Sequence, residues 1–309
     1  MVQSTSTPLP EPFDFHLTVS HQTYFRGRAG ADLYDDGVYY RALRRGERVV
    51  VASARPMNDA LEVAIAEGNE DDLQFACESM ARLLALDVDL AGFYALLEVD
   101  PVLSGAVAAV RGLRPPRAES VFEALVIAIL GQQISANVAR VIREGIMAAY
   151  GTPVEGFGKS LHAFPTPESL ASASPEELRA QKLSARKVEY VQDASRRAID
   201  GELDFPRFDG MSNEEVIAEL VKVRGIGRWT AEWVLLRALG RADVFPAGDL
   251  ALRRVVSELY FDGASITEAE LASFGERWAP YRGLATTYLF SVLRQQRVAK
   301  GGAAPAQPG

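Results

Sequence analysis

The sequence predicts an α+β fold, in which a small N-terminal domain of antiparallel sheet plus helix precedes a two-lobed, all-helical region containing a helix-hairpin-helix. Before residue 66, apolar and polar residues alternate in short runs with the two-residue period of strands. From about residue 93, apolar residues recur at helical spacing behind hydroxyl caps. Two glycines between two such helices, Gly225 and Gly227, predict the hairpin.

The chain divides into four predicted segments. Residues 1–12 are rich in Ser, Thr and Pro and are expected to be a disordered tail. An α/β domain covers 13–92, and the helical region covers 93–300 as two lobes around a cleft. Residues 301–309 form a second disordered tail without core-forming residues. With 48% hydrophobic residues, the chain has enough apolar surface for real cores.

Alternation predicts the strands of the first domain, at residues 15–19, 37–43, 49–53 and 61–65. Asn69 then caps a helix whose apolar stripe contains Cys77 as core filler. In the second region, residues with capping side chains start the helices: Ser120, Ser135, Thr166, Ser174, Ser184 and Ser212. Two further helices follow residue 249, near 252–259 and 281–293.

A predicted helix runs from about 213 to 223 and ends at the hairpin. Ile226 lies between the two glycines and should insert into the core, while the next helix runs from Arg228 to Leu239 and Gly240 suits its C-terminal cap. The unpaired amides after Gly227 form a site for an anion, with the Arg228 side chain beside it. On Gly-Ile-Gly alone, an ordinary helical turn is an equal alternative.

Composition excludes several classes of protein. A single cysteine, Cys77, excludes internal disulfides and four-cysteine metal clusters, and three scattered histidines form no metal-ligand pattern. No apolar run is long enough to span a membrane, and the N-terminus lacks a basic region followed by an apolar run. We therefore expect a cytoplasmic protein that binds no membrane.

The hairpin together with Asp249 downstream resembles the helix-hairpin-helix DNA glycosylase superfamily. Within it, the chain is most similar to the bacterial inducible alkylation-repair glycosylases, the DNA-3-methyladenine glycosylase II type. Further stretches occur in that family's order and at similar spacings: Gly112-Leu-Arg, 129–135, Phe164-Pro-Thr-Pro, Asp243-Val-Phe and 277–282. The resemblance covers 112–296 closely and the first hundred residues in outline, where the family's N-terminal domain carries no chemistry.

The resemblance implies base flipping followed by hydrolysis of the N-glycosidic bond, as in base excision repair. Breaking that bond produces an oxocarbenium-like sugar, which needs a fixed negative charge and a positioned water. Asp249 fits this role, although its place before a helix also makes it an ordinary N-cap. Asp243 is the competing acid and is interpreted as structural or solvated.

The lyase branch of the superfamily has a lysine at the second position beyond the second glycine, where this chain has Trp229. An indole cannot form a Schiff base, so the sequence predicts a monofunctional enzyme that leaves an abasic site. Trp229 and Trp233 lie four residues apart and should form an aromatic wall that attracts a cationic, N-alkylated base. By resemblance, Phe290 is a further pocket aromatic, and Leu250 stands where a tyrosine is expected.

The resemblance also implies contacts with DNA. The candidate residues are Gln132, Gln133, Arg224, Gly225, Ile226, Gly227, Arg228 and Thr230. Gln133 lies where the family has an apolar wedge that fills the gap left by the extruded nucleotide. Family hairpins also bind a monovalent cation, Na⁺ or K⁺, through carbonyls that correspond to Val221, Val223 and Ile226, although Arg224 replaces the usual proline. No cofactor is otherwise required.

Charge opposes extensive DNA binding, because the formal net charge is −8. A small basic footprint could compensate, from Lys182, Arg186, Lys187, Lys222, Arg224 and Arg228, though each is also an ordinary solvated charge. The expected partner is double-stranded DNA containing alkylated bases, bound by a monomer. The alternatives are a non-catalytic DNA-binding module and a glycosylase for oxidised or mismatched bases. Among alkylated lesions, 3-methyladenine, 7-methylguanine, 1-methyladenine, ethenoadenine and hypoxanthine stay open.

Overall fold

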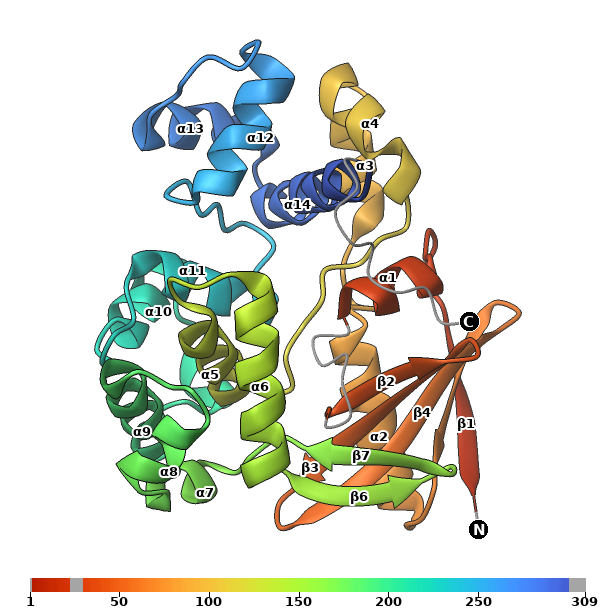
Figure 1. Ribbon diagram of the computed structural model, residues 1–309. Coiled ribbons are helices and arrows are strands. Elements are labelled where there is room, and N and C mark those ends of the chain that lie inside the picture. Colours follow the sequence, from red (N-terminus) through yellow and green to blue (C-terminus); the bar gives the residue numbers. More distant parts are fainter. Residues whose placement is uncertain (1, 23–29, 300–309) are drawn as a thin grey trace.

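The computed structural model describes residues 2–22 and 30–299, so the tail predicted at 301–309 lies outside the described residues. Figure 1 shows three bodies: an antiparallel sheet, a helical lobe beside it, and a second helical lobe above both. The predicted α+β fold class is confirmed. None of the helices that the structure describes combines the length and the apolar character needed to span a bilayer.

The N-terminal sheet has five strands in the order β1-β5-β4-β3-β2, and every neighbouring pair is antiparallel. The strands are β1 (Gln3–Pro8), β2 (Asp32–Asp35), β3 (Val38–Arg45), β4 (Arg48–Met57) and β5 (Ala60–Ile65). Helix α2 (Glu70–Leu83) covers one face and starts at a capping box of Asn69 and Asp72, so the predicted cap is confirmed.

Two N-terminal predictions are wrong. Residues 3–8 are not disordered, because β1 pairs along its whole length with β5, from Gln3 opposite Ile65 to Pro8 opposite Ala60. An edge strand is stabilised by its backbone hydrogen bonds and therefore needs few apolar side chains. The predicted strand at 15–19 is the helix α1 (Phe15–Gln22), whose buried residues follow helical spacing and whose first turn is capped by Asp14.

The helical region is interrupted by a hairpin that the sequence analysis missed, β6 (Thr152–Gly156) and β7 (Lys159–Ala163). It packs on the sheet face opposite α2, where Leu161 and Ala163 join Ala42 and Val51 in a small core. The sheet is therefore buried on both faces, which explains why β4 reads as a continuous apolar run rather than an alternation.

The first helical lobe has one core formed by residues between 118 and 244, together with Ala31. Its helices are α5 (Val121–Gly131), α6 (Ala136–Tyr150), α7 (Pro167–Ser172), α8 (Pro175–Ala180), α9 (Ala185–Ile199), α10 (Asn213–Leu220) and α11 (Arg228–Arg237), with a 3-10 turn at Phe205–Phe208. All six hydroxyl caps predicted for this lobe accept a backbone N–H at their helix start. Helix α5 is central and buried on nearly every side.

The second lobe is assembled from two distant parts of the chain. Residues 90–113 and 247–293 share its core. Its elements are α3 (Leu90–Leu97), α4 (Pro101–Val107), a 3-10 turn at Ala108–Val110, α12 (Leu250–Tyr260), α13 (Glu268–Gly275), a second turn at Glu276–Trp278, and α14 (Arg282–Ala299). Figure 1 shows two connections between the lobes, the segment that descends from α4 to α5 and the loop that rises from α11 to α12.

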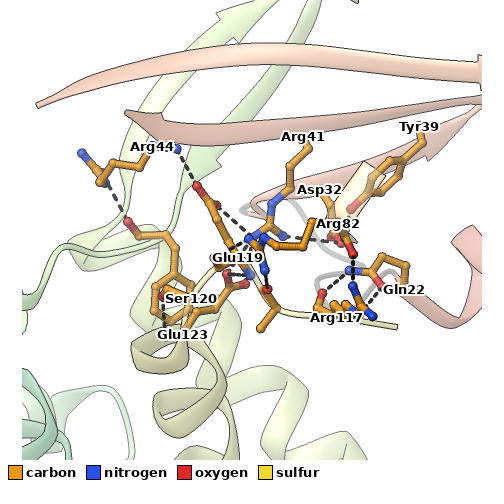
Figure 2. A network of polar contacts seen from close by, with 12 residues as sticks. Gln22, Asp32, Tyr39, Arg41, Arg44, Arg82, Arg117, Glu119, Ser120 and Glu123 are labelled. Carbon is orange, nitrogen blue, oxygen red and sulfur yellow. Dashed lines mark hydrogen bonds and ion pairs between the residues drawn. The ribbon is translucent and has the colours of Figure 1, made fainter. Parts of the chain in front are cut away.

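A buried polar network joins the sheet to the start of α5 (Figure 2). Arg41 on β3 is 2% exposed and lies 2.8 Å from Glu123, 3.3 Å from Glu119 and 3.8 Å from Asp32. Ser120 caps α5 as predicted, but the Glu123 side chain accepts from the Glu119 amide and from Arg41 instead of completing a capping box. The N-terminus of α5 is thus fixed to the sheet.

Candidate active site at the hairpin

The hairpin has the predicted geometry between α10 and α11. Val223 and Ile226 are buried, 2% and 5% exposed, so Ile226 does insert into the core. Gly225 has a φ of +79°, and a Cβ there would lie 2.2 Å from the Tyr190 ring, so a side chain is excluded. Gly227 is the N-cap of α11 and provides no side-chain cap, which leaves the first-turn amides of α11 available to a ligand.

Half of the predicted basic footprint is paired with carboxylates within the protein. Arg228 pairs with Glu214 at 2.5 Å and with Glu232 at 3.0 Å, and Arg224 pairs with Glu189 at 3.2 Å. Lys222 pairs with Glu219 at 2.5 Å, and Lys187 donates to the Leu130 carbonyl at 2.8 Å. Lys182 and Arg186 are exposed, without an ion-pair partner among the described residues. A phosphate would therefore have to compete with carboxylates for three of these six cations.

Burial changes the acid–base properties of one partner in this set. Glu232 is 7% exposed, and burial, opposed by the charge of Arg228, raises the pKa of its carboxyl to about 7. Hydrogen bonding to Glu214 raises the pKa of Arg228 above its ordinary value. The Thr230 side chain is 3% exposed on the inner face of α11, so a contact with DNA would have to use its first-turn amide, and this contact stays a prediction.

The turn between α5 and α6 lies against the hairpin. The Gln132 side chain donates from Nε2 to the carbonyl oxygen of Gly225 at 3.0 Å, across 93 positions of sequence. Gln133 follows with a φ of +57°, unusual for a residue with a side chain, and is exposed. Gln132 thus holds two surface elements together, whereas Gln133 projects from them.

The carbonyls proposed for a monovalent cation lie in the same segment. Val221 is the C-cap of α10, and Val223 already accepts the Ile226 amide at 3.1 Å. The last carbonyls of a helix lack intrahelical partners, so the segment has acceptor capacity left, and the Arg224 guanidinium is paired with Glu189. These carbonyl oxygens are suitable ligands for a monovalent cation, and the site stays a prediction.

Asp249 lies where the loop from the first lobe enters α12. Its Oδ1 accepts the amides of Ala251 at 2.8 Å and Leu252 at 2.9 Å, so the predicted N-cap role is confirmed. Its Oδ2 accepts the indole N–H of Trp229 at 2.9 Å. Asp243, the competing acid, pairs with Arg282 through both oxygens, at 2.6 and 2.9 Å, and is structural. The hairpin helix and Asp249 therefore form one site.

The predicted aromatic wall exists, but its members differ in exposure. The rings of Trp229 and Trp233 are 6.0 Å apart, and Phe290 lies 5.6 Å from Trp233. Trp233 is also covered by the Arg237 guanidinium, 4.6 Å from its ring centre, whereas Trp229 is 40% exposed. Leu250 is 72% exposed beside Asp249, and its place in a base pocket stays a prediction. Trp229 is therefore the ring that a base could reach, with Trp233 and Phe290 behind it.

Comparison with known proteins decides the family. Residues 126–280 match the model of the HhH-GPD superfamily of base excision DNA repair proteins, and residues 8–120 match the AlkA N-terminal domain. The chain belongs to the HhH-GPD superfamily. The match covers the hairpin, Trp229 and Asp249, whereas Phe290 lies beyond it.

Several proteins similar to this chain are named for 3-methyladenine, and one is named a probable N-glycosylase/DNA lyase. A DNA-3-methyladenine glycosylase of Bacillus subtilis is 29% identical over 92% of this chain and 95% of its own. The solved structure of a 3-methyladenine DNA glycosylase from Archaeoglobus fulgidus is 29% identical, covers 93% of this chain and 97% of its own, and has a TM-score of 0.82. A Schizosaccharomyces pombe 3-methyladenine DNA glycosylase, solved with abasic DNA, is 30% identical over 63% of this chain and 95% of its own, with a TM-score of 0.52.

Three features of this HhH-GPD site were missed by the sequence analysis. The Trp229–Asp249 bond, the Arg237 cover on Trp233 and the pairing of Arg228 with Glu232 all depend on three-dimensional placement. Only the third had a local signal, since Arg228 and Glu232 are four apart on one helix.

The two hairpin glycines should respond differently to alanine. Gly227→Ala meets no atom within 4 Å of the new Cβ, so we expect unchanged thermal stability but weaker binding of damaged and undamaged duplex alike, because the added methyl keeps a phosphate from the α11 amides. Gly225→Ala clashes with Tyr190 and should lower the melting temperature. Thermal melts and filter binding check both. A Gly227→Ala defect confined to damaged DNA would contradict the phosphate assignment.

Proposed function

We propose that the chain is a monofunctional DNA glycosylase that excises alkylated purines, of the 3-methyladenine kind, from double-stranded DNA. The observation that carries the proposal is Asp249, whose carboxylate is held by three N–H donors, one of which is the exposed indole of Trp229. The names of the relatives support the lesion class, and the relative solved with abasic DNA supports DNA as the partner.

In the proposed reaction, the damaged nucleotide leaves the stack and its base lies against Trp229. Gln133, exposed on the turn beside the hairpin, enters the space that the nucleotide vacates. The N-glycosidic bond then breaks and its electron pair goes to the base, so a positively charged N-alkylated purine departs neutral without a general acid. Asp249 stabilises the oxocarbenium-like sugar and positions the water, whose oxygen bonds to C1′ and whose proton is released to solvent.

The absence of lyase activity is part of the proposal. Lyase chemistry needs an amine that forms an imine with the sugar, and Trp229 occupies the position that the resemblance assigns to that lysine. The Trp229 indole nitrogen lies 2.9 Å from Asp249, so this position faces the carboxylate directly. A nitrogen that only donates a proton in a hydrogen bond cannot attack carbon.

Base release from a methylated duplex tests the proposal. We expect free alkylated purine in solution, together with an intact strand until alkali is added. Strand cleavage without alkali would contradict the monofunctional assignment. Binding of the duplex without release of any alkylated purine would instead support a non-catalytic DNA-binding module.

The salt dependence of binding should be shallow. Because most hairpin cations are paired with carboxylates, we expect the slope of log K against log salt to have a magnitude of roughly 2 to 4, which corresponds to a few phosphates. Fluorescence anisotropy with an undamaged duplex at several salt concentrations measures it. A slope near ten would require a broad basic surface and would refute the small footprint.

The proposal includes two further expectations. One hairpin and one Asp249 serve one lesion, so we propose a monomer on DNA. A monovalent cation bound by the carbonyls of Val221, Val223 and Ile226 would add positive charge at the hairpin for a phosphate.

A further inference from the structure

The carboxylate of Asp249 is restrained from two directions. Two backbone amides of α12 occupy Oδ1, and the only side-chain donor among the described residues, the Trp229 indole, occupies one side of Oδ2. A carboxylate has about four acceptor positions, so three donors leave one, on Oδ2. The Trp229 bond thus determines which way the remaining lone pair of Asp249 points.

The chemical nature of this donor matters as much as its position. A lysine or arginine at 2.9 Å would orient the carboxylate but would also cancel the charge that the oxocarbenium-like sugar needs. An indole N–H is neutral, so it restrains Oδ2 and leaves the full negative charge. Trp229 is also part of the exposed surface, so bound DNA would cover the bond and exclude the water that competes with it.

We propose that Trp229 is a positioning residue for Asp249: its indole N–H orients Oδ2 toward the reacting sugar and water without neutralising the carboxylate. This inference rests on the proposed function and adds to it, because Trp229 then acts on the bond-breaking step as well as on the binding of the base. An aromatic ring without the N–H should hold a base but should not complete the catalytic geometry.

The chain contains a matched control for this bond. Trp278 is fully buried in the second lobe and donates its indole N–H to Oδ2 of Asp100 at 3.0 Å. The chemistry and the length are nearly the same as at Trp229, but the bond lies in the lobe core with Tyr260 rather than at the hairpin. The chain has three tryptophans, so its indole N–H signals can be assigned individually by NMR.

The first experiment observes the bond without any activity assay. In Asp249→Asn the amide oxygen can still cap α12, but the NH₂ group then faces the Trp229 N–H, which loses its acceptor. We expect the Trp229 indole signal to move and to exchange faster with solvent in this variant, while the Trp278 signal stays in place. A Trp229 indole signal whose position and exchange rate are the same in Asp249→Asn as in the wild type would overturn the inference.

The second experiment measures catalysis with benzothienylalanine, a tryptophan isostere in which sulfur replaces the N–H, placed at position 229 or 278. At 229 we expect the single-turnover rate of base release to fall roughly 10- to 100-fold with unchanged DNA affinity, the size expected for a hydrogen bond to a charged group. At 278 the rate should not change. In an Asp249→Asn background the effect at 229 should disappear.

Three outcomes would overturn the positioning role: an equal fall at 229 and 278, a loss at 229 that appears only in affinity, or an undiminished effect in the Asp249→Asn background. Each of these requires a wild-type chain that releases base. A wild-type chain that releases no alkylated purine would refute the proposed function itself, and the NMR result would still decide whether the bond exists.

Discussion

Asp249→Asn should lower the rate of base release by about a hundredfold or more, the cost typical of removing one preorganised charge-stabilising group. The substitution removes the negative charge but keeps a good N-cap residue, so α12 should remain folded. Single-turnover release from a methylated duplex measures the effect. DNA affinity should change little, because phosphate contacts are assigned to the hairpin amides rather than to this carboxylate.

Asp243→Asn is the matched control, since Asp243 belongs to the same loop and forms its ion pair with Arg282 away from Trp229. It should affect stability more than the rate of base release. If Asp249→Asn released base at the wild-type rate, or if Asp243→Asn lost as much activity, Asp249 would not be the charge that stabilises the sugar.

Arg41→Met should lower the free energy of unfolding at neutral pH by about 3–5 kcal/mol, the cost typical of breaking a buried ion pair. Methionine keeps the apolar stem but lacks the guanidinium, so the loss combines the charge, its N–H donors and some buried volume. Without Arg41, three carboxylates remain close together: Asp32 and Glu123 are buried, and Glu119 is partly buried. Chemical denaturation monitored by circular dichroism measures the change.

The stability that Arg41→Met loses relative to the wild type should become smaller as the pH falls. In the wild-type chain, burial, opposed by Arg41, already raises the pKa of the Glu119 carboxyl above its ordinary 4.5. Removing Arg41 raises it further, so the folded variant binds protons more tightly than the unfolded chain. The free energy of unfolding of the variant is then greatest below the ordinary pKa of the carboxyl. It falls as the pH rises through the raised pKa that this carboxyl has in the folded state. The variant should therefore be closest to wild type near the acid end of the folding range.

Arg48→Met provides the comparison for this prediction. Arg48 also pairs with a carboxylate, Asp72, but its side chain is 62% exposed and Asp72 keeps Arg45 as a second partner. We expect a loss below about 1 kcal/mol. Equal losses in the two variants would mean that burial of the Arg41 cluster contributes nothing beyond a surface pair.

Local signals explain how much of the fold could be predicted. The capping residues and the strands between residues 37 and 65 have sequence patterns that act over a few residues, and they were placed correctly. Strand β1 could not be predicted, because its stability comes from β5, more than fifty positions away. In α1, Phe15 and Val19 suit both a strand and a helix, and the cap at Asp14 was overlooked.

The site, like the fold, could be predicted only where local sequence patterns determine it. Asp249 and the hairpin follow from motif spacing, and the placement of Trp229 near Trp233 follows from helical periodicity. The direction of each side chain did not follow. Whether Trp229 donates to Asp249, whether Trp233 is covered, and whether Arg228 is paired depend on contacts between elements. Sequence periodicity says which face of a helix a residue shares, but not what lies opposite that face.

The split origin of the second lobe has a consequence for biosynthesis. A ribosome delivers residues 90–113 long before 247–293, so α3 and α4 must wait for partners that are synthesised more than a hundred residues later. The sheet and the first lobe can fold during that interval, because almost all of their contacts lie within chain already made. Phe290, on the last helix, then closes the aromatic cluster behind Trp229. A nascent chain would therefore acquire its hairpin first and its complete site only after residue 290 has been synthesised.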